Sequence, residues 1–181
     1  MKKLFLVATA FSLSILTTQA QSNQAFTFGG GFDIGLPTGS FSNGWNFGFG
    51  FQLQGEQRFN DALSGVISTG YTNYFGKSID EGGGYSFKVP NVGFIPILVG
   101  LRIYPSEQFF IGGQIGLGAF TNTGASGNTG FDFNPQIGYN GNSCQLILGY
   151  NVVTVTAGSN SDVGLTLIFK FGQGGYHHRG Y

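Results

Sequence analysis

Hydrophobic and polar residues alternate along the segment from Trp45 to Phe59, WNFGFGFQLQGEQRF. Every second position from Trp45 to Leu53 is aromatic or aliphatic, whereas the positions between carry Asn, Gly or Gln, followed by Glu56 and Arg58. Successive side chains of a β-strand point to opposite faces of a sheet. This period of two therefore predicts a strand with one apolar and one polar face.

The same alternation recurs throughout the chain and predicts eight strands of about ten or more residues. The predicted strands are residues 25–36, 45–59, 62–75, 91–104, 108–120, 131–140, 143–155 and 162–171. Short turns alternate with longer polar connections, the longest of which covers residues 76–90. An even number of strands with alternating turn and loop lengths is typical of bacterial outer-membrane barrels, whose short turns face the periplasm.

The low content of charged residues decides which solvent lies on which face. Only 9% of the residues are charged, whereas the surface of a soluble protein is about a quarter to a third charged. We therefore expect the apolar faces to meet lipid and the polar faces to line the lumen. The predicted fold is all-β, an eight-stranded antiparallel up-and-down transmembrane β-barrel, closed because an open sheet edge in hydrocarbon leaves backbone groups unpaired.

The N-terminus has the pattern of a secretory signal peptide. Lys2 and Lys3 precede an apolar run that ends near Leu16, and Ala20 supplies a small residue before the predicted cleavage site at Gln21. The expected organisation is a signal peptide over residues 1–20, a barrel over 21–172 and a disordered tail over 173–181. The expected location is the outer membrane of a Gram-negative-type bacterium.

Charge, cysteine and proline content restrict the interpretation further. Without the two N-terminal lysines, the chain contains six basic and eight acidic residues. The mature chain therefore lacks the excess of basic residues that nucleic-acid binding requires. Cys144 is the only cysteine, which excludes an intramolecular disulfide. Pro96 and Pro135 fall inside predicted strands. Because proline cannot donate a ladder hydrogen bond, each position predicts a bulge or a strand end.

Six charged residues fall within the predicted strands, and each lies on the polar side of its alternation. They are Asp33, Glu56, Arg58, Arg102, Asp132 and Lys170. Asp162 is placed at a strand start. Three acidic and three basic groups balance, so they can form an ion-pair network inside a narrow lumen. Such a network is either a structural plug or a path for ions or protons, and we favour the plug because an eight-stranded barrel is just wide enough to be filled by side chains.

The chain offers few groups for catalysis or cofactor binding. The only histidines, His177 and His178, lie in the predicted tail, so the strands carry no histidine base beside a nucleophile. Two adjacent histidines without further ligands are weak support for a metal site. We therefore expect neither an enzyme nor a bound cofactor.

Aromatic residues at strand ends suit the interfacial girdles of a membrane barrel. They are Trp45, Tyr71, Tyr74, Tyr104, Tyr139 and Tyr150. The loop over residues 76–90 contains Tyr85 and Phe87. Because loops on a rigid scaffold carry most binding functions, it is the candidate contact surface for an extracellular ligand, although a simple solvated connection fits its composition equally well.

Two segments carry a family resemblance, IPILVGLRIYPSEQFFIGGQIGLGAF from Ile95 to Phe120 and the closing strand DVGLTLIFKF. Together with the signal peptide they resemble the small outer-membrane β-barrels of the OmpA/OmpX type, often labelled porin-family proteins. The resemblance implies contact with outer-membrane lipid and with the barrel-assembly machinery. The residues similar to the assembly signal on a last strand are Asp162, Gly164, Leu167, Phe169 and Phe171. Residues 172–181 extend beyond the position where such signals usually end.

Three functions follow from these observations. The leading hypothesis is a non-enzymatic barrel with a structural or surface-interaction role through its exterior loops. The alternative is a narrow porin-like channel for ions or very small solutes. An enzyme acting on lipid or peptide would need catalytic groups that the strands do not supply.

Overall fold

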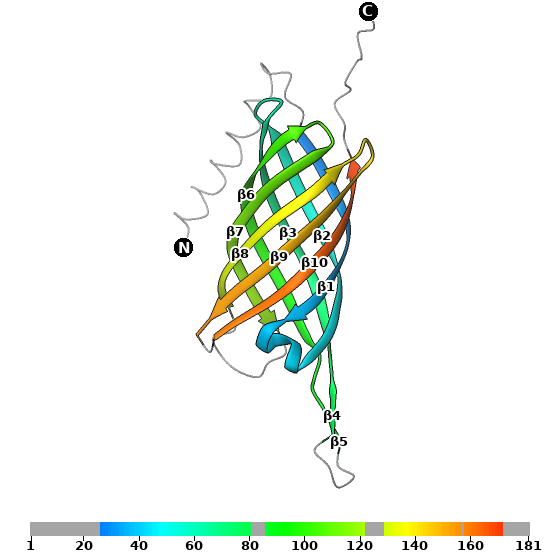
Figure 1. The fold of residues 1–181 in the computed structure, drawn as a ribbon, viewed down its shortest axis with the longest axis vertical. Coiled ribbons are helices and arrows are strands. Elements are labelled where there is room, and N and C mark those ends of the chain that lie inside the picture. Colours follow the sequence, from blue (N-terminus) through cyan, green and yellow to red (C-terminus); the bar gives the residue numbers. More distant parts are fainter. Residues whose placement is uncertain (1–25, 81–85, 122–128, 157, 172–181) are drawn as a thin grey trace, which may run out of the picture.

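The computed structural model describes residues 26–80, 86–121, 129–156 and 158–171, which form a closed antiparallel barrel (Figure 1). The strand order around the barrel is β1-β10-β9-β8-β7-β6-β3-β2. The barrel strands are β1 (Phe26–Thr38), β2 (Trp45–Arg58), β3 (Leu63–Gly76), β6 (Val92–Ser106), β7 (Phe109–Thr121), β8 (Thr129–Asn140), β9 (Cys144–Val155) and β10 (Gly158–Phe171). The predicted eight-stranded barrel is confirmed. The predicted signal peptide (1–20) and tail (173–181) lie outside the described residues.

Closure of the barrel brings its first and last strands together. Phe28 of β1 pairs with Phe171 of β10, and the register continues without a shift to Thr38 and Ser161. The last strand begins at Gly158, so the prediction that Asp162 stands at a strand start is wrong. Asp162 lies inside β10, where it pairs with Pro37 of β1 and Asn151 of β9.

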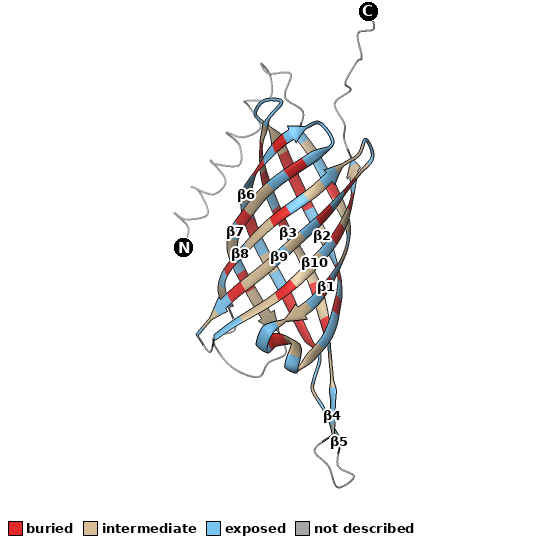
Figure 2. Cartoon of the chain, viewed as in Figure 1, coloured by how far each residue is buried: buried red, intermediate tan, exposed pale blue. Residues whose placement is uncertain are grey.

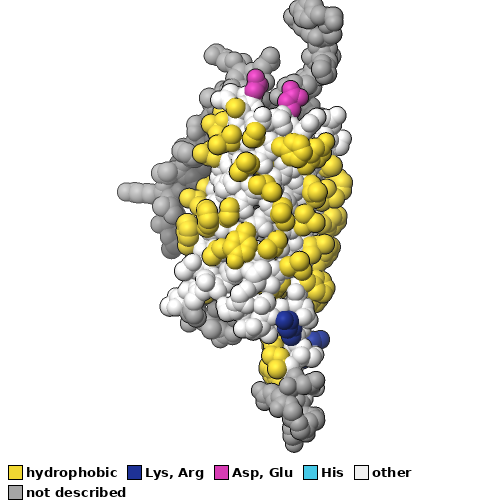
Figure 3. Space-filling model, in the orientation of Figure 1, with side chains coloured by type: hydrophobic (Ala, Val, Ile, Leu, Met, Phe, Trp, Pro, Cys, Tyr) yellow, Lys and Arg dark blue, Asp and Glu magenta, His cyan; other side chains and the backbone are white. Residues whose placement is uncertain are grey.

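Buried and more exposed residues alternate along the strands (Figure 2), as expected when successive side chains point to the lumen and to the outside. On the face shown in Figure 3, hydrophobic side chains cover the barrel wall and charged side chains appear only near its two ends. Ile97, Val99 and Leu101 of β6 are between 53% and 59% exposed, whereas Leu98 and Arg102 of the same strand are buried. An apolar exterior around a polar interior is the arrangement of a transmembrane barrel. No helix among the described residues is long and apolar enough to cross a membrane.

The two ends of the barrel differ. At one end, here called the turn end, residues 59–62, 107–108 and 141–143 join the strands. At the other, the loop end, the 3₁₀-helix η2 (Gly39–Asn43) joins β1 to β2. There a ribbon of β4 (Ser78–Asp80) and β5 (Ser86–Lys88) extends between β3 and β6, clear of the barrel (Figure 1). The segment predicted as a loop over residues 76–90 is thus partly an ordered hairpin.

Neither proline ends a strand or forms a bulge, so that expectation is wrong. In the β3–β6 ladder the pairs Thr69–Ile97 and Thr72–Phe94 keep one register, and only the pairs around Pro96 are missing. The Thr69 hydroxyl donates to the Pro96 carbonyl oxygen over 2.8 Å, which satisfies an acceptor that the interrupted ladder leaves without its usual partner. The β8–β9 ladder skips Pro135 in the same way, with no change of register.

Three of the predicted girdle aromatics lie elsewhere. Tyr74 and Tyr104 are 2% and 5% exposed and lie in the lumen. The register of β2 against β3 shifts between Trp45 and Gly48. An extra residue in one strand of a pair changes the direction in which the neighbouring side chains of that strand point. Trp45 therefore packs on the lumen cluster at the loop end, 4.9 Å from the Phe41 ring, and not on the outer face.

Candidate functional site

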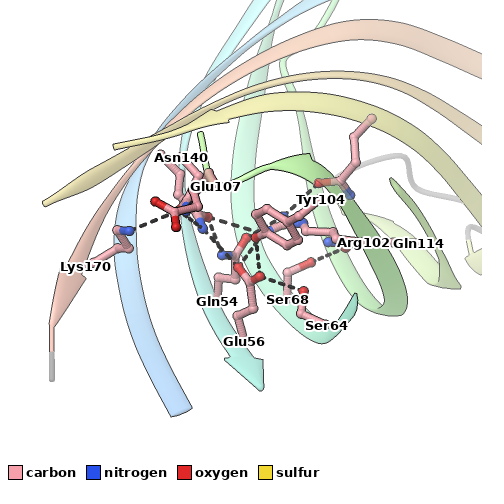
Figure 4. Close-up of polar contacts among 12 residues, drawn as sticks. Gln54, Glu56, Ser64, Ser68, Arg102, Tyr104, Glu107, Gln114, Asn140 and Lys170 are labelled. Carbon is pink, nitrogen blue, oxygen red and sulfur yellow. Dashed lines mark hydrogen bonds and ion pairs between the residues drawn. The ribbon is translucent and has the colours of Figure 1, made fainter. Parts of the chain in front are cut away.

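The turn-end half of the lumen is filled by a polar network centred on Arg102, which is completely buried (Figure 4). Its Nη1 lies 2.9 Å from Glu56 Oε2, forming a buried salt bridge. The same guanidinium donates to glutamine side chains from three other strands: Nη2 to Gln54 of β2 over 2.8 Å, Nη2 to Gln136 of β8 over 2.7 Å, and Nη1 to Gln145 of β9 over 3.2 Å. A planar group with five donors suits this role.

Glu56 accepts the remaining hydrogen bonds of this network. Its carboxylate accepts hydrogen bonds from Ser64 over 2.6 Å, from Gln145 Nε2 over 2.9 Å and from the Tyr104 hydroxyl. A buried charge pair is tolerated when its remaining hydrogen-bonding groups are satisfied. Apart from Arg102 Nε, which has no hydrogen-bond partner among the described residues, this pair meets that condition. The network therefore ties β2, β3, β6, β8 and β9 together across the lumen.

Apolar and aromatic side chains complete this layer. Tyr104, Phe110, Ile147 and Ile168 form a buried cluster at the turn end. The Arg102 guanidinium carbon lies 4.4 Å from the Phe110 ring centroid, and that of Arg58 lies 3.3 Å from the Tyr104 ring centroid. Cations over aromatic faces are attracted by the ring quadrupole. These contacts fill the cross-section next to the salt bridge.

The loop-end half of the lumen has a different chemistry. Asp33, Asp132 and Asp162 all face inward there, and no salt bridge joins them to any cation of the described residues. Beyond them, a cluster containing Phe41, Tyr74, Val92, Phe94 and Val153 closes this end. We call it the aromatic cap. Phe41 comes from η2 and is only 3% exposed, so the helix between β1 and β2 folds over the lumen.

The six charges predicted for the lumen are thus divided between its two halves. Within the described residues, Arg102 and Glu56 are the only two of the six that form a salt bridge. Lys170 donates to Asn140 Oδ1 over 3.0 Å, and Arg58 donates to the Asp61 carbonyl oxygen over 3.0 Å. Asp33 accepts a 2.9 Å hydrogen bond from Thr72, whereas neither carboxylate oxygen of Asp132 has a hydrogen-bond partner within the part of the chain that the structure describes.

Sequence reasoning missed the glutamines and Tyr104 as members of the network. Alternation placed Gln54 and Gln136 on polar faces, whereas Gln145 was assigned to neither face of its strand. What the sequence did not give was the register between strands, which brings these three side chains to the same height along the barrel axis. Among the described residues, no group of three or more His, Cys, Asp or Glu side chains is arranged to hold a metal ion.

The residues of the predicted assembly signal all lie on β10. Phe169 and Phe171 are exposed on the outer wall, Leu167 and Gly164 are partly buried, and Asp162 faces the lumen. Recognition by the assembly machinery stays a prediction.

The hairpin at the loop end is the second candidate site. Ile79 of β4 pairs with Phe87 of β5, and their side chains are 40% and 61% exposed. Lys88 is exposed beside them. Tyr85, which was also expected on this surface, lies outside the described residues. An exposed apolar pair beyond the barrel wall, next to a cation, makes this hairpin a candidate contact surface.

Several hydrogen bonds hold the base of this hairpin. Lys77 N donates to Gly44 O over 2.8 Å, and its Nζ donates to Ser42 O over 2.5 Å. Trp45 Nε1 donates to Pro90 O over 3.1 Å. The hairpin is therefore fixed to η2 and to the start of β2, next to the aromatic cap.

Comparison with known proteins places the fold. No family model matches the sequence, and no curated protein sequence matches it. Among solved structures, the Yersinia pestis outer membrane protein Ail in a phospholipid bilayer nanodisc is 16% identical, with a TM-score of 0.54 over 79% of this chain and 99% of that chain. Ail crystallised with the heparin analogue sucrose octasulfate is 13% identical, with a TM-score of 0.52 over 82% and 97% of the two chains.

Neisserial surface protein A is 15% identical, with a TM-score of 0.51 over 83% of this chain and all of that chain. The likeness spans nearly the whole length of each of these barrels. The chain therefore has the fold of the small outer-membrane barrels, and the resemblance predicted from the sequence is confirmed at the level of the fold.

Proposed function

We propose that the protein resides in an outer membrane as a closed barrel and that its task is to hold the β4–β5 hairpin outside the cell as a contact surface. The observation that carries the proposal is the pairing of a side-chain-filled lumen with an external hairpin that exposes Ile79 and Phe87. In barrels of this architecture the longer connections face the exterior. The hairpin then points away from the cell, and the outer wall contacts lipid.

The filled lumen supports a structural role for the interior. The polar network around Arg102 and Glu56, here called the Arg102 layer, and the aromatic cap lie at different heights along the barrel axis. A continuous water path therefore requires both to open. A cavity of about 40 Å³ between them favours the alternative of a narrow channel, because it is lined by polar groups such as Gln52, Asn134 and Thr166. We favour the closed barrel because the charged and aromatic side chains of both layers are already engaged with one another.

The external partner is proposed to be an anionic polysaccharide. Ail was crystallised with a heparin analogue, and this chain places Lys77 and Lys88 at the hairpin beside the apolar pair. Charge attraction of this kind weakens as ionic strength rises. Lys88 is the more available of the two, because Lys77 Nζ already donates to Ser42 O.

Two measurements test the proposal. The membrane-extracted protein, verified by heat-dependent migration on a gel, is placed in a planar bilayer, and we expect no steady conductance. The same protein in nanodiscs is passed over immobilised heparin, and we expect capture that salt reverses and that Lys88→Gln or the double change Ile79→Ser and Phe87→Ser reduces. Ser86→Ala in the same hairpin is the matched control and should bind like the wild type.

Each part of the proposal has a result that would reject it. Steady conductance of the wild-type protein supports the channel. If heparin still captures the variants with substitutions in the hairpin, the contact surface lies elsewhere. If heparin does not capture the wild-type protein, the polysaccharide is rejected as the ligand.

A further inference from the structure

The outer wall of the barrel has a groove where β7, β8, β9 and β10 lie side by side (Figure 1). Its volume is about 340 Å³. The floor is a row of paired residues, Gly112, Gln136 and Gly149, one from each of the first three strands. The Gln136 side chain points into the lumen, where it accepts a hydrogen bond from Arg102. This row therefore contributes backbone, and no polar side chain, to the groove.

Apolar side chains form the two sides of the groove. Toward the turn end, Ile111, Ile137 and Leu148 pair in a single row and are between 44% and 59% exposed. Toward the loop end, the side is formed by Pro135 of β8 and by Tyr150 of β9 with its partner Val163 of β10. The groove is therefore an apolar channel that crosses several strands.

A glycine keeps the groove open at β7. Gly113 pairs with Pro135 in the row on the loop-end side. No atom of the described residues lies within 4 Å of the position that a Cβ on Gly113 would take. Ile111 and Ile115, which precede and follow it on the outer face of β7, are both well exposed. A large side chain at Gly113 would therefore extend into free space beside the groove.

The position of the groove indicates the chemistry of its occupant. It is continuous with the apolar wall that the barrel presents to the hydrocarbon of the outer membrane, so acyl chains surround it. Between apolar groups in hydrocarbon there is no hydrophobic driving force, and packing contacts decide what binds. A groove offers a chain contacts on several sides, which a flat wall does not. An apolar cavity of about 150 Å³ binds benzene, and a groove of about 340 Å³ has room for a longer alkyl segment.

Tyr150 gives the groove a direction. Its hydroxyl lies 3.5 Å from Oγ1 of Thr38, the last residue of β1 at the loop end. Tyrosine rings commonly lie at the level of the lipid headgroups, and the longer connections of such barrels face the exterior. The groove thus begins near the headgroups of the outer leaflet and leads into the hydrocarbon toward Ile111.

We infer that this groove binds one saturated acyl chain of an outer-leaflet lipid, with the headgroup near Tyr150. The ladders of β8 with β7 and with β9 run without a register shift through the groove, so its sides are straight. An extended saturated chain follows such a groove, whereas a cis double bond bends a chain out of it. The inference rests on the membrane location of the barrel and does not involve the β4–β5 hairpin.

The test measures which lipid stays bound when the protein leaves the membrane. The protein is folded in vesicles with equal amounts of dimyristoyl- and dioleoylphosphatidylglycerol, extracted in a mild detergent and analysed by native mass spectrometry. We expect a single retained lipid per barrel, with the dimyristoyl form preferred. Gly113→Phe should reduce retention about tenfold, because the ring takes the place of part of the chain and its packing contacts. Ala119→Phe, on the same face of β7 but outside the groove, is the matched control and should retain lipid like the wild type.

Several results would overturn the inference. They are no retained lipid in the wild type, equal retention by the wild type and Gly113→Phe, and equal retention of the two lipids by the wild type. A dimer that Gly113→Phe abolishes would make a second copy of the chain the occupant.

A second measurement needs no substitution in the groove, in case Gly113→Phe does not fold. A phospholipid with a photoactivatable saturated chain is added to vesicles that contain the wild-type protein. Crosslinks should concentrate on Ile137 and Leu148. Crosslinks spread evenly over the wall, including β1 and β2, would mean that the chain is not held in the groove.

Discussion

Arg102 and Glu56 face each other across the lumen with Nη1 and Oε2 2.9 Å apart, and their side chains are 0% and 4% exposed. Arg102 comes from β6 and Glu56 from β2, two strands that are separated by β3 in the barrel. The pair therefore braces the barrel through its interior, in addition to the hydrogen bonds that run around its wall.

Replacing Arg102 by alanine should destabilise the barrel strongly. The change leaves Glu56 charged, buried and without its cation, which typically costs about 3–5 kcal/mol. Urea unfolding of the protein in vesicles, followed by the loss of the fast-migrating species on an unheated gel, measures the effect. Arg58→Ala is the matched control. Arg58 is only half-buried and contacts a backbone oxygen and the Tyr104 ring, so we expect a loss of about 1 kcal/mol or less. Equal losses for the two variants would contradict the bracing role of Arg102.

Removing both charges together should restore much of the lost stability. The double change Arg102→Met and Glu56→Leu eliminates the pair without leaving an isolated buried charge, and such replacements are often neutral or stabilising. A double-mutant cycle over the two single variants and the double variant should give a coupling free energy of about 1–3 kcal/mol. Purely additive losses would mean that the two residues do not act as a pair.

A charge on the outer wall should oppose insertion. Val99 lies in the middle of β6 and is 53% exposed, so Val99→Arg places a cation near the bilayer midplane at a cost of about 2–4 kcal/mol. Ile79→Arg makes a similar change on the hairpin outside the barrel and should alter stability by less than about 0.5 kcal/mol. Folding yields in vesicles compare the two. Equal yields would argue against a lipid-facing wall at Val99.

Two neighbouring glycines should respond oppositely to alanine. A Cβ on Gly100 would lie 2.0 Å from the carbonyl oxygen of Gly113 and 2.7 Å from Gln114 Cα, so the backbone of β7 would have to move. No atom of the described residues lies within 4 Å of a Cβ on Gly113. We expect Gly100→Ala to cost about 1–3 kcal/mol and Gly113→Ala to be neutral or stabilising by up to about 1 kcal/mol. Urea unfolding midpoints in vesicles check this, and a reversed order would contradict the close packing of β6 on β7.

The sequence predicted the wall of the barrel better than its interior. Alternation assigns each residue to one face because the side-chain period of a strand is two, and residues such as Ile97 and Arg102 lie on the predicted sides. Alternation does not give the height of a residue along the barrel axis, which depends on the register between strands. For that reason Asp132 and Arg102 were expected in one network, although the structure places them in different halves.

The misassigned aromatics have a local cause. The shift between Trp45 and Gly48 changes the phase of β2 near its start, and no residue in WNFG marks it. Tyr74 follows the inward alternation of β3 from Thr72, and only the preference of tyrosine for interfaces suggested the outer wall. At Pro96 the expectation failed because the ladder resumes in the same register on the far side of the proline, where the Thr69 hydroxyl donates to the Pro96 carbonyl oxygen.

The attachment of the hairpin has a mechanical consequence. β4 and β5 continue from β3 and β6, which are neighbours in the barrel. A tensile force on the hairpin therefore pulls both strands along their axes, against β2 on one side and β7 on the other. Those two ladders are loaded in shear, so many hydrogen bonds resist the force together, and the barrel is suited to withstand tension applied from outside.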